Sequence, residues 1–478
     1  MIQRICLLAA CAWLSGSVLG QTTQPADRKV PESRGKAAEI PAKAAMPSII
    51  QQLPDYTGDL ARRQYLTGDW GGARADLSEH GVLFELSATQ ILQDNAHGGK
   101  DTNNGFRYAG SADYTLKLDS ARMNLWPGGL LTLHGETQFG QSVMRKTGAV
   151  LPPNFDALLP LPDDGGLTTL SEFYLTQAFS EQFVVVLGKI NGLGLGDMTE
   201  FAANETTQFM NTGFRLNPML GLYAPYTAMT AAAVYMPTKW LKVTSGISDN
   251  DPNGAATRTG FNTTFHGRDW LSVSQEWELT IKPFGQTGHQ RFGWAWSSRD
   301  RALLDQDIRI NLPTIAFRQF LSKSRPLMRL ARLAGATRSF EVDTRPDDWM
   351  MYYNFDQYLY TKPDDPAQGF GLFGRFGFST GESNPFDQFY SLGLGGKGLI
   401  PTRAKDSYGV GYFLANLSND LPAILSASDE QGVEAYYNIE VTPWLHVSPD
   451  LQVIVRPGGG FQDRETALVC GLRMQMTF

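Results

Sequence analysis

The chain has 478 residues, a formal net charge of −7 and 42% hydrophobic residues. With a pI of about 5.5, it lacks the basic footprint of a nucleic-acid-binding protein. After the amino-terminus no run approaches the ~18 consecutive apolar residues of a membrane-spanning helix, and the mean hydropathy is −0.24. These values exclude nucleic acid as a partner and disfavour a helical membrane protein, but they permit membrane strands in which every second residue faces water.

The amino-terminus has the pattern of an export signal. Arg4 precedes an apolar run, Ile5–Leu14, and small residues follow at a spacing that signal peptidase accepts. This run is too short to span a membrane, and too few apolar residues precede Cys11 to favour lipidation. We therefore expect a signal peptide at 1–20.

Two further regions follow the signal. Residues 21–60 are rich in Ala, Pro, Lys and Gln, which predicts a flexible periplasmic arm. No linker interrupts residues 61–478, which we expect to form one domain. Cys470 alone remains after signal removal, and a single thiol can form neither an internal disulfide nor a cysteine metal cluster.

Segments with period-two alternation recur from residue 82 to the end of the sequence. In the first, Val82, Phe84 and Leu86 alternate with Glu85 and Ser87. Further segments lie at 108–119, 131–139, 273–282, 433–441 and 467–478, the last ending on an aromatic residue. One lipid-facing and one water-facing side is the pattern of an outer-membrane barrel strand. The sequence thus predicts an all-β fold, a transmembrane antiparallel β-barrel of about 16 strands.

The connections between these segments alternate in length. Short links at 180–182, 237–239, 283–288 and 442–443 alternate with long ones near 141–168, 191–225, 249–271 and 299–347. Aromatic residues flank the short links, as in the girdle at a membrane interface. This predicts short periplasmic turns, long extracellular loops and a place in the outer membrane of a Gram-negative-type bacterium, in contact with lipid and lipopolysaccharide.

The longest loop, 299–347, carries six basic residues without an intervening acid, at 318, 323, 325, 329, 332 and 338. These residues would meet anionic lipid head groups or fold over the pore mouth if they lie on a short amphipathic helix. A mobile outer loop is an equal alternative.

Several sequence blocks resemble those of a known family. Leu66-Thr67-Gly68-Asp69-Trp70-Gly71-Gly72 with Arg74 is similar to the entry motif of the carbohydrate-selective porins, the OprB family. The resemblance continues at Gly188-Lys189-Ile190-Asn191, Asn354-Phe355-Asp356-Gln357, Gly374-Arg375-Phe376-Gly377 and Val441-Thr442-Pro443-Trp444-Leu445. It implies a sixteen-stranded outer-membrane pore through which sugars diffuse passively into the periplasm, past a constriction of charged and polar side chains.

Inward-facing charges are the candidates for that constriction. The assumed register places ten acids and six bases in the lumen, an excess of acid that predicts slight cation preference: Glu85, Asp113, Asp119, Glu136, Glu172, Glu276, Glu278, Asp356, Glu434 and Glu440, and Lys117, Lys242, Lys282, Arg291, Arg375 and Arg473. The resemblance makes Glu136 the first candidate, although Thr137 replaces the basic residue that follows this acid in some relatives. The further candidates are Arg74, Glu172, Arg375, Asp113 and Lys117.

Other functions remain as alternatives. A general, non-selective diffusion porin would share the barrel, and an exported β-rich enzyme acting on carbohydrate would share the acids and aromatics. The sequence singles out no catalytic pair and no nucleophile-elbow motif, so we expect no enzyme activity, no cofactor and no metal site. A gated transporter would need ~22 strands and a plug, and an adhesion barrel stays open. Glucose or small oligosaccharides are the expected solutes, and a homotrimer is an open alternative for the assembly.

Overall fold

The computed structural model describes residues 47–103, 105–157, 166–194, 196–223, 226–250, 270–305, 343–421, 428–460 and 465–478. The predicted signal peptide, the first part of the predicted arm and the six basic residues between 318 and 338 lie outside these residues.

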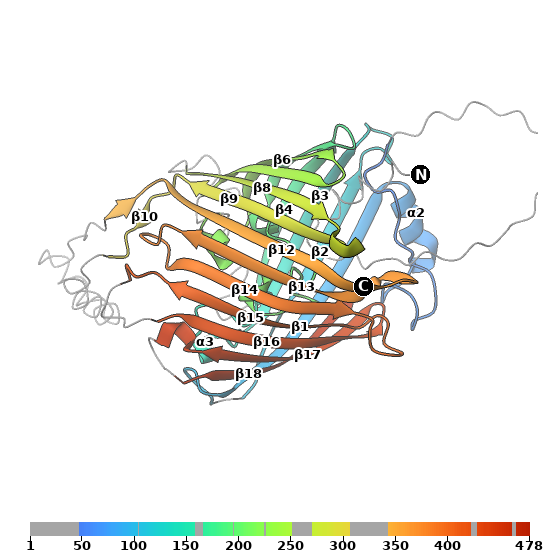
Figure 1. Cartoon of the computed structure of the whole chain (residues 1–478). Helices are drawn as coiled ribbons and strands as arrows, with labels where there is room; N and C mark the ends of the chain where they lie inside the picture. Colours follow the sequence, from blue (N-terminus) through green and yellow to red (C-terminus); the bar gives the residue numbers. More distant parts are fainter. Residues whose placement is uncertain are drawn as a thin grey trace, which may run out of the picture.

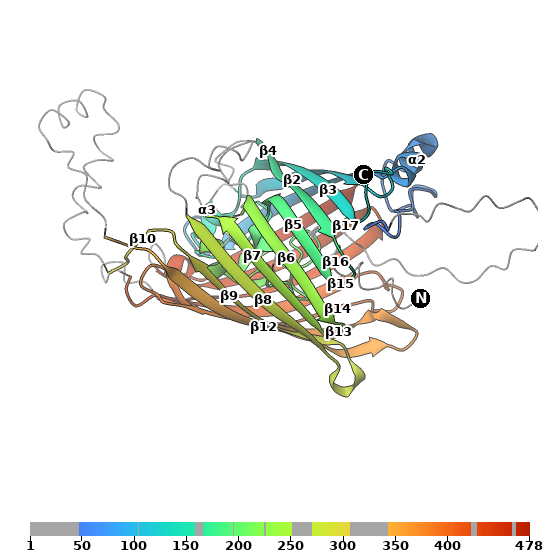
Figure 2. The same ribbon diagram turned by 90° about the horizontal axis from the view of Figure 1, so that it is seen from above.

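Sixteen strands of the described chain close into one antiparallel barrel, which confirms the predicted architecture (Figures 1 and 2). Each strand pairs with its neighbours in chain order, and β1 closes on β18. The strands are β1 (Val82–His97), β2 (Arg107–Asp119), β3 (Gly129–Gly140), β4 (Leu167–Ala178), β5 (Phe183–Ile190), β6 (Ala228–Thr238), β7 (Leu241–Asp249), β8 (Leu271–Ile281), β9 (Gly288–Ser297), β12 (Asp348–Lys362), β13 (Asp365–Ser379), β14 (Phe386–Lys397), β15 (Ser407–Leu417), β16 (Glu430–Thr442), β17 (Leu445–Val455) and β18 (Ala467–Thr477).

The remaining elements are short and lie in the connections. β10 (Arg301–Ala302) and β11 (Thr344–Arg345) form a two-stranded ribbon at the end of the barrel opposite α2 and the carboxy-terminus (Figure 1). The helices are η1 (Trp70–Gly72), α2 (Ala73–Glu79), α3 (Met144–Thr147), η2 (Gly192–Gly194), α4 (Thr212–Arg215), η3 (Pro218–Leu222), η5 (Pro283–Gly285) and η8 (Pro457–Gly460). Within the described residues, no helix has the length and apolar character needed to cross a membrane.

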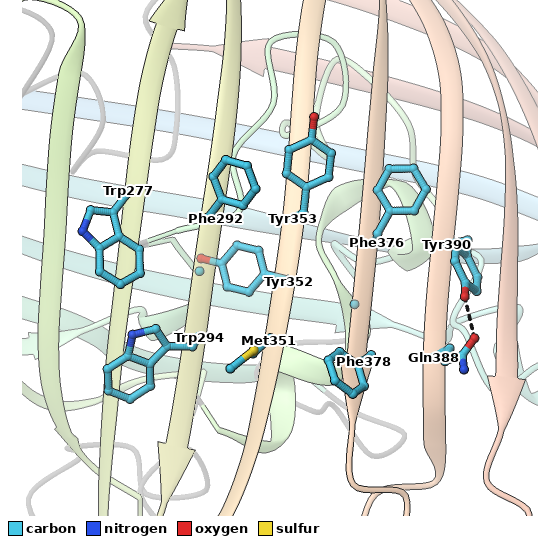
Figure 3. A pocket seen from close by; sticks show the side chains of 12 residues that line it. Trp277, Phe292, Trp294, Met351, Tyr352, Tyr353, Phe376, Phe378, Gln388 and Tyr390 are labelled. Atoms are coloured by element: carbon cyan, nitrogen blue, oxygen red, sulfur yellow. Dashed lines mark hydrogen bonds between the residues drawn. The ribbon is translucent and has the colours of Figure 1, made fainter.

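The two faces of the strands differ as the alternation predicts. On β18, Leu472 is 47% exposed on the outer surface, whereas its neighbour Arg473 is 1% exposed and points into the barrel. Outward aromatic residues of β8, β9 and β12–β14 line a groove of about 690 Å³ on the outer wall (Figure 3). Their rings contact one another, with Phe292 and Tyr353 at a centroid distance of 4.9 Å. An apolar outer wall of this kind suits contact with lipid chains.

Part of the predicted flexible arm packs against the barrel. Ile49 and Tyr56 are buried, and the Ser48 hydroxyl donates to Asp119 Oδ2 at 2.6 Å. Asp119 also accepts the backbone N–H groups of Ala121 and Arg122, so it caps the turn after β2 instead of facing the channel. Residues 47–60 therefore cover the turns at the end of the barrel that carries α2.

Candidate functional site: the pore constriction

The connection between β5 and β6, residues 191–227, folds back into the barrel. Glu434 on β16 accepts the backbone N–H groups of Met210 (2.6 Å) and Asn211 (2.9 Å). Across the lumen, Glu276 on β8 accepts the N–H of Asp197 at 2.8 Å. Because β8 and β16 lie far apart around the barrel, these contacts hold the connection across the lumen.

Arg375 on β13 is the central anchor of this connection. Its fully buried guanidinium is paired with the fully buried Asp197 at 3.1 Å. It also donates to the carbonyl groups of Phe214 and Ala202, both at 2.6 Å. A planar guanidinium with five N–H donors suits such a site, because it can satisfy the carboxylate and several carbonyl groups at once.

Glycines on the inner wall make room for aromatic rings of the same connection. A Cβ atom at Gly411 of β15 would lie 2.5 Å from the ring of Phe214, and one at Gly395 of β14 would lie 2.6 Å from Phe201. Side chains at these inward positions would displace the rings. The connection therefore packs directly on the inner face of β13–β15 and closes that side of the lumen.

The connection between β3 and β4 also turns inward. Glu430 on β16 accepts the N–H groups of Val150 (2.7 Å) and Leu151 (2.8 Å), and Gln452 on β17 donates to the Pro153 carbonyl at 2.9 Å. The N–H of Phe155 donates to the Met210 carbonyl at 2.8 Å, which joins the two inward loops. The inner faces of β2–β4 lie across the barrel from β13–β15, on the other side of both loops.

Titratable side chains gather on these inner faces. His134 on β3 lies between two carboxylates, with Nε2 3.1 Å from Asp113 of β2 and Nδ1 3.2 Å from Glu172 of β4. Two carboxylate partners favour a doubly protonated imidazole, since both ring nitrogens then donate. All three side chains are partly exposed, so they border open space in the lumen.

Glu136 completes the cluster. It lies directly opposite Asp113 in the β2–β3 register, and its carboxylate accepts the hydroxyl groups of Ser171 (3.1 Å) and Tyr226. Like charges directly opposite each other weaken a strand pair. Tyr226 comes from the 191–227 connection, so the loop contacts the cluster directly.

Asp156 adds a carboxylate from the other loop. The Ser111 hydroxyl on β2 donates to Asp156 Oδ1 at 2.9 Å. Burial and the nearby charges of Asp113 and Glu205 raise the pKa of Asp156 well above its ordinary value. The described residues hold no group of three or more His, Cys, Asp or Glu side chains placed to bind a metal ion.

The structure brings together three of the six residues predicted for the constriction: Asp113, Glu136 and Glu172. Lys117 lies on the same strand as Asp113, but its ammonium is paired with Glu85 at 2.9 Å. Arg375 is buried behind the inward loop, where it holds Asp197 and is shielded from the channel.

Arg74 lies away from the lumen, on α2. Its guanidinium contacts the rings of Tyr56 (4.3 Å), Tyr65 (4.5 Å) and Trp70 (5.1 Å), and it donates to the carbonyl groups of Phe84 and Phe478, both at 2.9 Å. These contacts tie the amino-terminal segment to the seam between β1 and β18. This placement makes Arg74 a structural residue of the barrel end.

Three residues of the cluster were not among the predicted set. His134 lies two residues before Glu136, in phase with it on one strand, and this spacing could have indicated a shared inner face. Tyr226 and Asp156 lie in loops without periodicity, so no local signal in the sequence places them at the constriction.

A closed barrel of sixteen strands with an apolar outer face, a polar lumen and two inward loops defines an outer-membrane diffusion channel. A family model described as carbohydrate-selective porin, OprB family, matches residues 103–478. The chain belongs to this family, and it is therefore a sugar porin of the outer membrane. Membership of a porin family implies a channel rather than an enzyme.

The chain also resembles individual porins along most of its length. It is 22% identical to Porin B of Pseudomonas aeruginosa over 455 residues, covering 87% of this chain and 91% of the relative. It is 21% identical to the putative porin QuiX of Acinetobacter baylyi over 451 residues, with 87% and 93% covered. The high-pH structure of Pseudomonas putida OprB has a TM-score of 0.74 at 20% identity and covers 88% of this chain and 100% of that chain. This last likeness supports the fold.

Proposed function

We propose that glucose or small oligosaccharides diffuse through the passage between β2–β4 and the two inward loops, with Asp113, Glu136 and Glu172 as the constriction. His134, Tyr226 and Asp156 complete this set. The observation that carries the proposal is the convergence of these groups, from three strands and two loops, beside the inner wall that the loops face.

The chemistry of these groups suits a sugar in transit. A sugar that enters a narrow channel exchanges hydrogen bonds with water for hydrogen bonds with protein. Carboxylates accept from sugar hydroxyl groups, while the Tyr226 hydroxyl and the His134 ring are donors. The groups already bond one another, so a sugar competes for them and binds weakly, as release from a channel requires.

Glu136→Gln tests this assignment. The change keeps the shape of the side chain but removes its charge, and we expect a several-fold rise in the glucose concentration that half-blocks the single-channel current, the scale of about 1 kcal/mol for one charge-assisted hydrogen bond. Glu181→Gln is the matched control, because Glu181 is an exposed acid in the turn between β4 and β5, outside the lumen. Equal behaviour of the two variants would contradict the assignment.

A further inference from the structure

Carboxylates from five separate elements surround the proposed constriction. Asp113, Glu136 and Glu172 lie on consecutive strands, Asp156 on the 141–157 loop and Glu205 on the 191–227 loop. Asp156 is close enough to Asp113, Glu136 and Glu205 for their charges to act on it, so the acids of the strands and of both loops share one region.

The basic groups of this region are withdrawn from the passage. Arg215 is 3% exposed and paired with Glu205, whose side chain is 21% exposed. Lys189 on β5 is buried and donates to the Leu170 carbonyl at 2.8 Å. The exposed edge of the region is thus mainly acidic, with the Asp113 side chain 23% exposed.

Two further bases belong to this region. Arg473 on β18 is 1% exposed and donates to the Glu205 carbonyl group at 2.6 Å. The other is His134, on β3. Both ring nitrogens of His134 contact carboxylates, so two negative charges lie beside the positive charge of an imidazolium here.

The side chains that reach the passage are therefore mainly acidic: those of Asp113, Glu172 and Glu205 are 23%, 16% and 21% exposed, whereas Lys189, Arg215 and Arg473 are buried. Exposed carboxylates outnumber exposed bases whether His134 is neutral or protonated. A solute in the passage meets negative potential in either state.

Resting on the proposed function, we infer that this constriction selects sugars by charge: it admits neutral sugars and cationic amino sugars and rejects anionic sugars such as uronates and sugar phosphates. One unit charge about 4 Å from another in water contributes about 1 kcal/mol, or roughly a five-fold change in concentration. With three partly exposed carboxylates at the passage, amino sugars should enter at least ten-fold faster than uronates, because attraction of the cation and repulsion of the anion each contribute roughly one such five-fold step. Salt should reduce the difference.

Four probes of similar size separate the outcomes. Proteoliposomes that hold the full-length protein are exposed to glucosamine, N-acetylglucosamine, glucose and glucuronate at mildly acidic pH, where the free amine is protonated and the uronate is ionised. We expect glucosamine to enter faster than glucose, N-acetylglucosamine to follow glucose, and glucuronate to be nearly excluded. If glucose itself fails to enter, the proposed function is wrong. If glucose enters and glucosamine and glucuronate enter equally fast, only the charge selection is wrong.

The Asp113→Asn variant tests whether this cluster sets the selection. It should bring the glucosamine-to-glucuronate ratio several-fold closer to one, whereas Glu181→Gln, in the exposed turn between β4 and β5, should leave it unchanged. The reversal potential of the unmodified protein in a KCl gradient is a second readout that needs no variant. A cation-selective potential agrees with the inference, and an anion-selective one would overturn it.

Discussion

Replacing Arg375 by methionine tests whether the inward 191–227 loop narrows the pore. The change leaves the buried Asp197 carboxylate without its guanidinium and removes the hydrogen bonds to the Phe214 and Ala202 carbonyl groups. Loss of one partner of a buried ion pair costs about 3–5 kcal/mol. The barrel strands keep their own pairing, so this cost should fall on the loop, which keeps its contacts with Glu434 and Glu276 but loses its central anchor.

We therefore expect Arg375→Met to form a folded barrel with larger single-channel conductance, more current noise and weaker block by glucose. Planar-bilayer recordings measure all three quantities, and heat-modifiable migration in a gel checks the fold. Arg62→Met is the matched control, because the Arg62 side chain is 87% exposed and its ion pair with Asp59, at 3.8 Å, lies at the surface. A folded Arg375→Met variant with unchanged conductance, noise and block would refute the role given to the loop.

Three further changes give expected outcomes. Tyr226→Phe removes the hydroxyl that contacts Glu136 and should weaken glucose block by a few-fold without lowering thermal stability, measured by bilayer recording and gel migration. Arg74→Met should lower barrel stability by about 2–4 kcal/mol, from three ring contacts and two hydrogen bonds, seen as a lower temperature for loss of heat-modifiable migration. Asp156 has a raised pKa in the folded state, so its contribution to stability is fully present below its ordinary value of 3.8 and is lost as the pH rises through the raised value. Asp156→Asn should flatten this pH dependence, and proteolysis of the 141–157 loop at acid and neutral pH measures it.

The barrel itself could be predicted from the sequence because each strand carries its own signal. Alternation such as that of β18 depends only on neighbouring residues, and the membrane imposes it on every strand. The same alternation correctly predicted that the side chains of Glu136, Glu276 and Glu434 point into the barrel. Asp119 followed the alternation but caps a turn, because it lies at the last position of its strand.

The roles of the inward residues were harder to predict, because they depend on where the loops lie. Glu434 and Glu276 accept hydrogen bonds from loop N–H groups, and Arg375 pairs with Asp197. Each of these contacts joins residues more than seventy positions apart. Nothing local in the sequence distinguishes such an anchor from Asp113, which borders the passage. The amino-terminal arm shows the same limit. Tyr56 is buried beside Ser78, and the composition of the arm does not indicate that contact.

The most direct test of a sugar-selective constriction is the current of the unmodified protein in planar bilayers, with glucose, maltodextrins and an uncharged polymer of similar size added in turn. The structure predicts saturable block by the sugars and little specific block by the polymer, because only the sugars can exchange hydrogen bonds with Asp113, Glu136 and Glu172. Equal effects of sugars and polymer would contradict it and would indicate a general diffusion pore.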